Sequence, residues 1–267
     1  MNLRHTLPAL FLAAAGLSAC SSGTPTDALP TAGVTYLPEC SGDNDGVIAP
    51  GELHFVPGLK APYALQRADD TPVEVSGTPD AAAWDFTHAR FEGLEELPTL
   101  SPAGYWYSDA FPEANLVIPF DAPGAPPGHL LLRNTPEVLS ILGVASIEPE
   151  KQLLHYTAPV PFMQFPMALG DARSAAVGLA PGSVWQGLAL DDLGVLDTYT
   201  LTVDARGVLS LPGMSIDNVL ALTLKMERTV PDQPTTVAEQ TYLVHECLGT
   251  VGVRSGAGPW RIVWYPR

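Results

Sequence analysis

The chain has 267 residues, of which 46% are hydrophobic, enough apolar material for one large domain or two modest ones. It contains 29 Asp and Glu residues against 13 Lys and Arg residues, so its formal net charge at pH 7 is −16. Because nucleic-acid binding and electrostatic attachment to anionic lipid both need basic patches, this charge argues against both.

The first residues resemble the signal peptide of a bacterial lipoprotein. Arg4 supplies the positive charge, and Leu7 to Leu17 form an apolar stretch that is too short to span a bilayer, which takes about 20 residues. Leu17-Ser18-Ala19-Cys20 resembles a lipobox, in which small residues admit the signal peptidase and the thiol accepts diacylglycerol. We therefore expect residues 1–19 to be removed and Cys20 to be lipidated; the alternative is an ordinary secretory signal that contains a cysteine.

Residues 20–35 are predicted to form a flexible tether, because Ser, Thr, Pro, Gly and Ala dominate from Ser21 to Gly33 and bury little. No later segment reaches transmembrane length, so the lipid on Cys20 is the expected membrane attachment. By resemblance to other lipoproteins, Ser21 in place of an Asp favours the outer membrane over the inner. The predicted location is thus the cell envelope of an exporting cell.

The three cysteines are Cys20, Cys40 and Cys247. Once Cys20 is lipidated, the other two are expected to join in an oxidising compartment. A Cys40–Cys247 disulfide would close a loop of about 200 residues and stabilise the fold by about 5 kcal/mol in the chain-entropy model. The alternative is a pair of buried free thiols.

Residues 36–62 contain a segment, 41–52 (SGDNDGVIAPGE), that resembles an EF-hand calcium loop when aligned on Gly46. Oxygen ligands alternate along such a loop while the glycine reverses the chain, which suits a hard cation that takes six to eight oxygens. The predicted calcium ligands are the side chains of Ser41, Asp43, Asp45 and Glu52 and the backbone carbonyl of Val47.

The loop also departs from the EF-hand pattern. Ser41 replaces the carboxylate usual at the first position, no helix is predicted before the loop, and Pro57-Gly58 would stop a helix after it. The sequence therefore predicts a lone calcium site with a dissociation constant as weak as about 10⁻⁴–10⁻³ M. A turn without metal is the alternative, because Asp, Asn and Gly favour turns by themselves. If calcium binds, its expected role is structural, since the loop lies beside Cys40.

Residues 63–267 are predicted to form a β-rich domain, and the pattern is compatible with a subdomain boundary near 148–160. The 24 glycines and 27 prolines interrupt the chain too often for long helices. A short helix is expected only at 87–97. Strands are predicted in the first half at 63–67, 73–77, 115–120, 129–133 and 139–147.

The clearest strand pattern is Asp197 to Val203, where Tyr199, Leu201 and Val203 alternate with threonines. Asp204-Ala-Arg-Gly207 predicts a turn after it. Further strands are expected at 208–211, 219–230, 241–245, 250–254 and 261–265. The fold class is therefore mainly β: an antiparallel sandwich, a barrel or a curved half-barrel with few short helices.

Two apolar segments each allow two interpretations. Tyr105-Trp106-Tyr107 would be a stacking platform for a glycan or a part of the core. Pro159 to Leu169 would be a strand at the mouth of a hydrophobic cavity, as in periplasmic lipoprotein carriers, an analogy at the level of the fold alone.

Several short motifs follow one another along the chain: the lipobox, Cys40 with its Asp-Gly loop, Trp84-Asp85-Phe86, and Glu246-Cys247 followed by Gly249, Val251 and Arg254-Ser255. This order resembles a family of uncharacterised myxobacterial-type exported lipoproteins with a lone EF-hand-like loop. The resemblance implies an exported, lipid-anchored and β-rich protein, and it implies no activity.

Enzyme signatures such as H-E-x-x-H and G-x-S-x-G do not occur in the sequence. We therefore expect a non-enzymatic structural or binding module with a calcium-stabilised loop, whose partner would be a protein, a glycan or an apolar ligand. One alternative is a carrier or sensor of an apolar ligand in a curved β-sheet. The other is a hydrolase whose site is assembled only in three dimensions.

Overall fold

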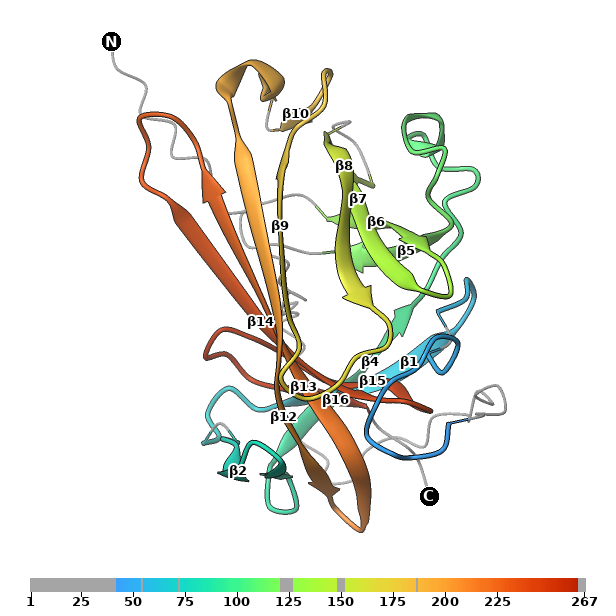
Figure 1. Cartoon of the computed structure of the whole chain (residues 1–267), viewed down its shortest axis with the longest axis vertical. Helices are drawn as coiled ribbons and strands as arrows, with labels where there is room; N and C mark the ends of the chain where they lie inside the picture. The colour runs from blue at the N-terminus through green and yellow to red at the C-terminus, as the bar shows by residue number, and fades with distance from the viewer. Residues whose placement is uncertain are drawn as a thin grey trace.

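The computed structural model describes residues 42–53, 55–71, 73–120, 127–147, 152–185 and 187–263. These residues form two β-sheets that pack against each other and two short 3-10 helices, η1 (Ser108–Ala110) and η2 (Asp191–Leu193) (Figure 1). The predicted mainly β fold is therefore confirmed. The predicted signal peptide and tether, with Cys20, Cys40 and Ser41, lie outside the described residues.

The larger sheet has ten strands and includes the longest strands of the protein, which cross the molecule diagonally in Figure 1. In spatial order they are β2 (Ser76–Thr78), β3 (Ala81–Asp85), β12 (Leu196–Leu211), β13 (Met214–Thr229), β14 (Thr236–His245), β15 (Gly249–Ser255), β16 (Arg261–Val263), β1 (Lys60–Gln66) and β4 (Phe91–Pro98), with β9 (Ala172–Gly178) also paired to β12.

The smaller sheet has six strands, in the spatial order β11 (Leu188–Ala189), β10 (Val184–Trp185), β8 (Leu153–Gln164), β7 (Val138–Ser146), β6 (Gly128–Asn134) and β5 (Leu116–Phe120). Neither sheet closes into a barrel within the described ranges, since β2, β4, β5 and β11 end the two strand orders. Apart from the parallel pair β3–β12, the strand pairs are antiparallel, so the arrangement is a sandwich of two open sheets.

The turn predicted at Asp204–Gly207 is wrong, because β12 runs without interruption through these residues. They are instead the site of two irregularities in its pairing with β13. The first half of β12 pairs with β9 and the second half with β3, so the strand changes neighbours here. Gly207 is needed for this exchange, since a Cβ on it would lie 1.7 Å from the carbonyl oxygen of Ala82. The glycine thus allows close approach of two strands rather than a reversal of the chain.

The helix predicted at 87–97 is also wrong, because residues 91–98 form strand β4 along the edge of the larger sheet. β4 pairs with β1 over its whole length, and the register shifts beside Gly93, whose φ of 64° is left-handed. A left-handed residue at this point interrupts a helix but suits a β-bulge. Pairing with β1 therefore overrides the local sequence preference.

The main core lies between the two sheets. Leu132 and Val144 of the smaller sheet and Leu201 and Leu222 of the larger one belong to the same buried cluster. The smaller sheet is buried on its other face too, where Leu131 packs with Tyr107 and Phe111. Burial on both faces explains why residues 130–132 are three consecutive leucines instead of an alternating pattern.

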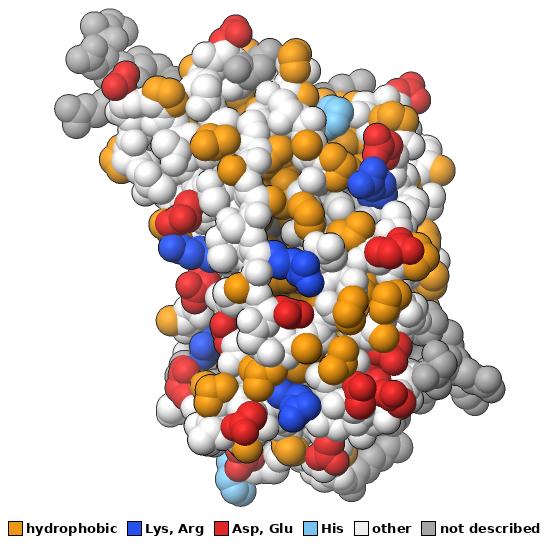
Figure 2. All heavy atoms as spheres, viewed as in Figure 1, with side chains coloured by type: hydrophobic (Ala, Val, Ile, Leu, Met, Phe, Trp, Pro, Cys, Tyr) orange, Lys and Arg blue, Asp and Glu red, His pale blue; other side chains and the backbone are white. Residues whose placement is uncertain are grey.

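The charge of the surface agrees with the acidic composition of the chain. On the face shown in Figure 2, acidic side chains outnumber basic ones and are spread over the surface, in keeping with the net charge of −16. None of the described helices has the length and hydropathy needed to cross a membrane.

Candidate metal centre

The segment predicted to bind calcium folds into a tight acidic loop, residues 42–47. The backbone N–H of Asp45 donates to Oδ1 of Asp43 at 3.3 Å, and the N–H of Val47 donates to Oδ1 of Asp45 at 2.7 Å. Asn44 and Gly46 have left-handed φ angles of 57° and 82°. Asp, Asn and Gly are the residues that favour such turns, because short polar side chains bind the nearby backbone and Gly has no Cβ.

The acidic loop is hydrogen-bonded to β12 and β13 of the larger sheet. The carbonyl of Asn44 accepts a hydrogen bond from Nδ2 of Asn218 at 2.7 Å, and that of Asp45 accepts one from Nη1 of Arg206 at 3.3 Å. Gly46 lies against the same arginine, since a Cβ on it would come within 2.6 Å of Cδ of Arg206. The left-handed turn therefore favours glycine here, and its lack of a Cβ lets the Arg206 side chain come close.

Glu246 faces the acidic loop from the turn between β14 and β15. Its side chain is buried, with 1% of the residue exposed. Oε2 accepts a hydrogen bond from the backbone N–H of Asn44 at 3.0 Å, whereas Oε1 has no hydrogen-bond partner. Burial raises the pKa of Glu246, and the nearby carboxylates of Glu52, Asp43 and Asp45 raise it further, against the lowering effect of the Asn44 N–H. The surroundings therefore do not compensate the negative charge of this buried carboxylate.

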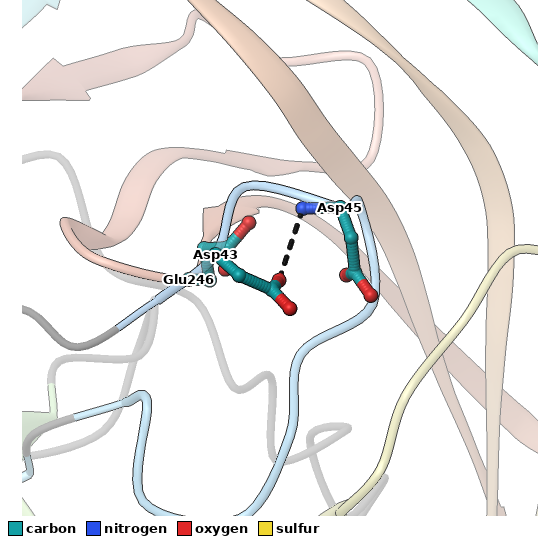
Figure 3. Close-up of side chains that lie close together, drawn as sticks. All are labelled: Asp43, Asp45 and Glu246. Atoms are coloured by element: carbon teal, nitrogen blue, oxygen red, sulfur yellow. Dashed lines mark hydrogen bonds between the residues drawn. The ribbon is translucent and has the colours of Figure 1, made fainter.

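The carboxylates of Asp43, Asp45 and Glu246 form a cluster, with one oxygen of each within 4.8 Å of the others (Figure 3). Each carboxylate uses one oxygen to accept a backbone N–H from the acidic loop. Each second oxygen receives no hydrogen bond from another described residue. Three clustered carboxylates from two distant parts of the chain, each with an oxygen outside these hydrogen bonds, are a donor set suited to a hard cation such as calcium.

This cluster differs from the predicted ligand set. Asp43 and Asp45 are brought together as predicted, but the third carboxylate is that of Glu246, which is not one of the predicted ligands. Glu52 lies outside the cluster, and its Oε2 accepts the backbone N–H of Ala49 at 2.6 Å. Val47 contributes its N–H to the loop, and Ser41 lies outside the described residues.

Cys247 follows Glu246 directly, and its sulfur is disulfide-bonded. Its predicted partner, Cys40, lies outside the described residues, so the Cys40–Cys247 pairing stays a prediction. The predicted disulfide could have identified Glu246 as the third carboxylate. A bond between Cys40 and Cys247 would place residues 41–45 beside residue 246. The resemblance to an EF-hand loop, in contrast, concerns only ligands that are close in sequence.

The two apolar segments contribute to the core. Tyr107 is fully buried and stacks on Tyr105 with a centroid distance of 5.2 Å, while Nε1 of Trp106 donates to the carbonyl of Ser146 at 2.9 Å. In the second segment, Phe162 and Met167 are buried between the two sheets.

In three comparisons, no family model, no curated protein and no solved structure matched the chain. The interpretation of the site therefore depends on its own geometry. The Asp43, Asp45 and Glu246 cluster is the one group of three or more potential metal-binding side chains found among the described residues.

Proposed function

We propose that the protein is a non-enzymatic module of the bacterial cell envelope, anchored in the outer membrane by lipid on Cys20 and stabilised by a calcium ion held by Asp43, Asp45 and Glu246. One observation carries the calcium part of the proposal. The buried carboxylate of Glu246 has an oxygen without a hydrogen-bond partner, and two further carboxylates lie beside it. The export signal supports the envelope location.

Electrostatics favours a cation at this position. Removal of a carboxylate from water costs several kcal/mol unless an opposite charge compensates it, and neighbouring carboxylates add repulsion. No lysine or arginine forms an ion pair with these three carboxylates among the described residues. A divalent cation would neutralise most of the negative charge and bind the oxygens that receive no hydrogen bond.

Calcium fits this donor set better than magnesium. Calcium accepts six to eight oxygens in flexible geometry, whereas magnesium requires a nearly regular octahedron and releases its waters reluctantly. Asp43 and Asp45 are exposed, so water can complete the shell on that side. Because the ligands belong to the start and the end of the β-domain, the expected role of the ion is to hold the two together.

Calorimetric titration of the mature full-length chain with calcium tests the proposal. We expect a dissociation constant of about 10⁻⁴–10⁻³ M. About 5 mM calcium should then stabilise the fold by about 1–2 kcal/mol and raise Tm by about 2–8 °C. EDTA should reverse the shift, and magnesium should produce a smaller one.

A double variant, Asp43→Asn with Asp45→Asn, should lose the response to calcium. Asp109→Asn is the matched control, because Asp109 is an exposed aspartate in η1, outside the cluster, and this variant should respond as the unaltered protein does. If the unaltered protein shows neither heat of binding nor a change in Tm at several millimolar calcium, the proposed site is wrong.

A further inference from the structure

The residues that would hold the cation also attach the acidic loop to the domain. The carbonyls of Asn44 and Asp45 accept hydrogen bonds from Asn218 and Arg206, and the N–H of Asn44 donates to Glu246. The donors belong to β12 and β13, and the acceptor belongs to the β14–β15 turn, so the loop contacts consecutive strands of the larger sheet. Cation binding and docking of the loop therefore involve the same three consecutive residues, 43–45.

We infer that calcium controls this docking: the bound ion holds residues 42–47 against the domain, and loss of the ion releases them. This inference rests on the proposed calcium site. With the ion present, Asp43, Asp45 and Glu246 are all attracted to one centre. Without it, the two loop carboxylates repel the buried carboxylate of Glu246, and only a few hydrogen bonds oppose that repulsion.

The release should end at Ile48. This residue is 2% exposed, belongs to the core between the sheets, and exchanges two backbone hydrogen bonds with Met167, each of 2.9 Å. None of these contacts depends on the carboxylates. At the other end of the loop, the predicted Cys40–Cys247 disulfide would keep the chain close to the domain. Opening is therefore a local event of the acidic loop and not an unfolding of the sheet.

The consequence is a surface that changes with calcium. In the docked state the loop carbonyls accept hydrogen bonds from the guanidinium of Arg206 and the amide of Asn218. In the released state these two donors face solvent, and Glu246 loses its cover. By thermodynamic linkage, calcium strengthens docking by the same factor by which docking strengthens calcium binding, so a variant that weakens docking should bind calcium less tightly.

Hydrogen exchange of the mature full-length chain, measured by mass spectrometry in calcium and in EDTA, tests the inference. Calcium should slow exchange about tenfold or more in fragments that contain residues 42–47, where Asn44, Asp45 and Val47 donate hydrogen bonds. Exchange that proceeds by local opening elsewhere, as in the partly exposed edge strand β4, should not change. If calorimetry shows calcium binding but exchange of residues 42–47 is unchanged, the docking inference is overturned and the site stands. If calorimetry shows no binding, both are overturned.

Two variants test the linkage without alteration of a calcium ligand. Asn218→Gly removes the donor to Asn44 and tolerates the left-handed φ of 55° at this position, and Arg206→Ala removes the donor to Asp45. Each should weaken calcium binding several-fold. Asp232→Gly is the control, because Asp232 also has a left-handed φ and is exposed, and this variant should bind calcium as the unaltered protein does. Unchanged affinity in both variants would overturn the inference.

Discussion

Asp197 and Arg228 face each other across β12 and β13 and form a bidentate ion pair inside the core. Nε and Nη2 of Arg228 donate to the two oxygens of Asp197 at 2.7 and 2.6 Å. Tyr156, from β8 of the other sheet, donates to the same carboxylate at 2.9 Å and also contacts the hydroxyl of Tyr199. Burial alone would lower the pKa of Arg228, but the bond to Asp197 raises it, so the guanidinium stays charged.

This ion pair predicts a non-additive effect on stability. Arg228→Leu should destabilise the fold by about 3–5 kcal/mol in urea denaturation, because it leaves the Asp197 carboxylate buried without a cation. The double variant with Asp197→Leu should lose less than Arg228→Leu alone. Tyr156→Phe should cost about 1.5–3 kcal/mol, because its hydroxyl donates to a charged carboxylate.

The exposed pair Lys225–Glu227, at 3.0 Å, provides the comparison. Lys225→Met should change stability by less than about 1 kcal/mol, since exposed ion pairs contribute little. A double variant at 197 and 228 that is less stable than Arg228→Leu would contradict the interpretation of the buried pair.

The same pair shows how far the sequence alone can predict this fold. The alternation from Asp197 to Val203 predicts a strand and assigns Asp197 to the same face as Tyr199, but it does not predict which strand supplies the opposite charge. That depends on the register of β12 against β13, which also pairs Leu201 with Leu224. Strands β3 and β9 were not predicted, because their alanine-rich sequences have no strong alternating pattern.

Two of the three carboxylates of the candidate metal centre were predicted, and the third was not, for a similar reason. Asp43 and Asp45 belong to a recognisable turn motif, so the local sequence identified them. Glu246 is 202 residues from Asn44, and nothing in its own sequence neighbourhood distinguishes it except the adjacent Cys247. Ligands that meet only through tertiary structure need a long-range constraint, and here the predicted disulfide was the available one.

Glu246→Gln should leave stability unchanged or raise it without calcium, and lower it relative to the unaltered protein when calcium is present. In EDTA the variant should be as stable as the unaltered protein or more stable, because it removes a buried charge beside two carboxylates and keeps an oxygen for the Asn44 N–H. In about 5 mM calcium the unaltered protein should be more stable by about 1–2 kcal/mol. Urea denaturation in both buffers measures the difference.

Glu239→Gln is the matched control for this variant, since Glu239 is an exposed glutamate on β14. It should leave the order of stabilities the same in both buffers. A Glu246→Gln variant that is much less stable in EDTA would mean that the carboxylate is stabilised by the protein itself, without an ion.

The Cys40–Cys247 disulfide predicts a mass difference of two hydrogens between the reduced and non-reduced mature chain. Peptide mapping without reduction should recover a cross-linked pair that contains both residues. Replacement of both cysteines by serine should destabilise the fold by about 3–5 kcal/mol, because the closed loop is long. Free thiols at both positions in the non-reduced protein would contradict the pairing.

Lipidation at Cys20 predicts that the protein fractionates with membranes and incorporates a labelled fatty acid. Cys20→Ser should abolish the label and release a chain with the same thermal stability into the soluble fraction, since the lipid lies outside the β-domain. Ser21→Asp leaves the lipid site intact and should shift the protein to the inner membrane, by resemblance to other lipoproteins. An unlabelled protein that is cleaved after a different residue would show an ordinary secretory signal.

His129 should make the fold less stable as the pH falls below neutral. The residue is 3% exposed, its Nδ1 is hydrogen-bonded to the hydroxyl of Tyr107, and burial lowers its pKa. The unfolded chain binds a proton near pH 6.5, whereas the folded chain resists protonation until a lower pH. The contribution of His129 is therefore complete above about pH 6.5 and is lost as pH falls from there towards its folded pKa, by up to about 1.4 kcal/mol per pH unit.

Urea denaturation at pH 7.5 and 5.5 tests this expectation. His129→Asn removes the titrating group and keeps a polar atom near Nδ1, so the loss of stability between the two pH values should be smaller in the variant than in the unaltered protein. The remaining loss arises from other groups, which include His155, whose pKa burial also lowers. His88→Asn, at an exposed position, is the control and should keep the full pH dependence. Equal pH dependence in His129→Asn and the unaltered protein would mean that His129 takes up its proton equally well in the folded and unfolded chains, and that its contact with Tyr107 does not depend on the neutral ring.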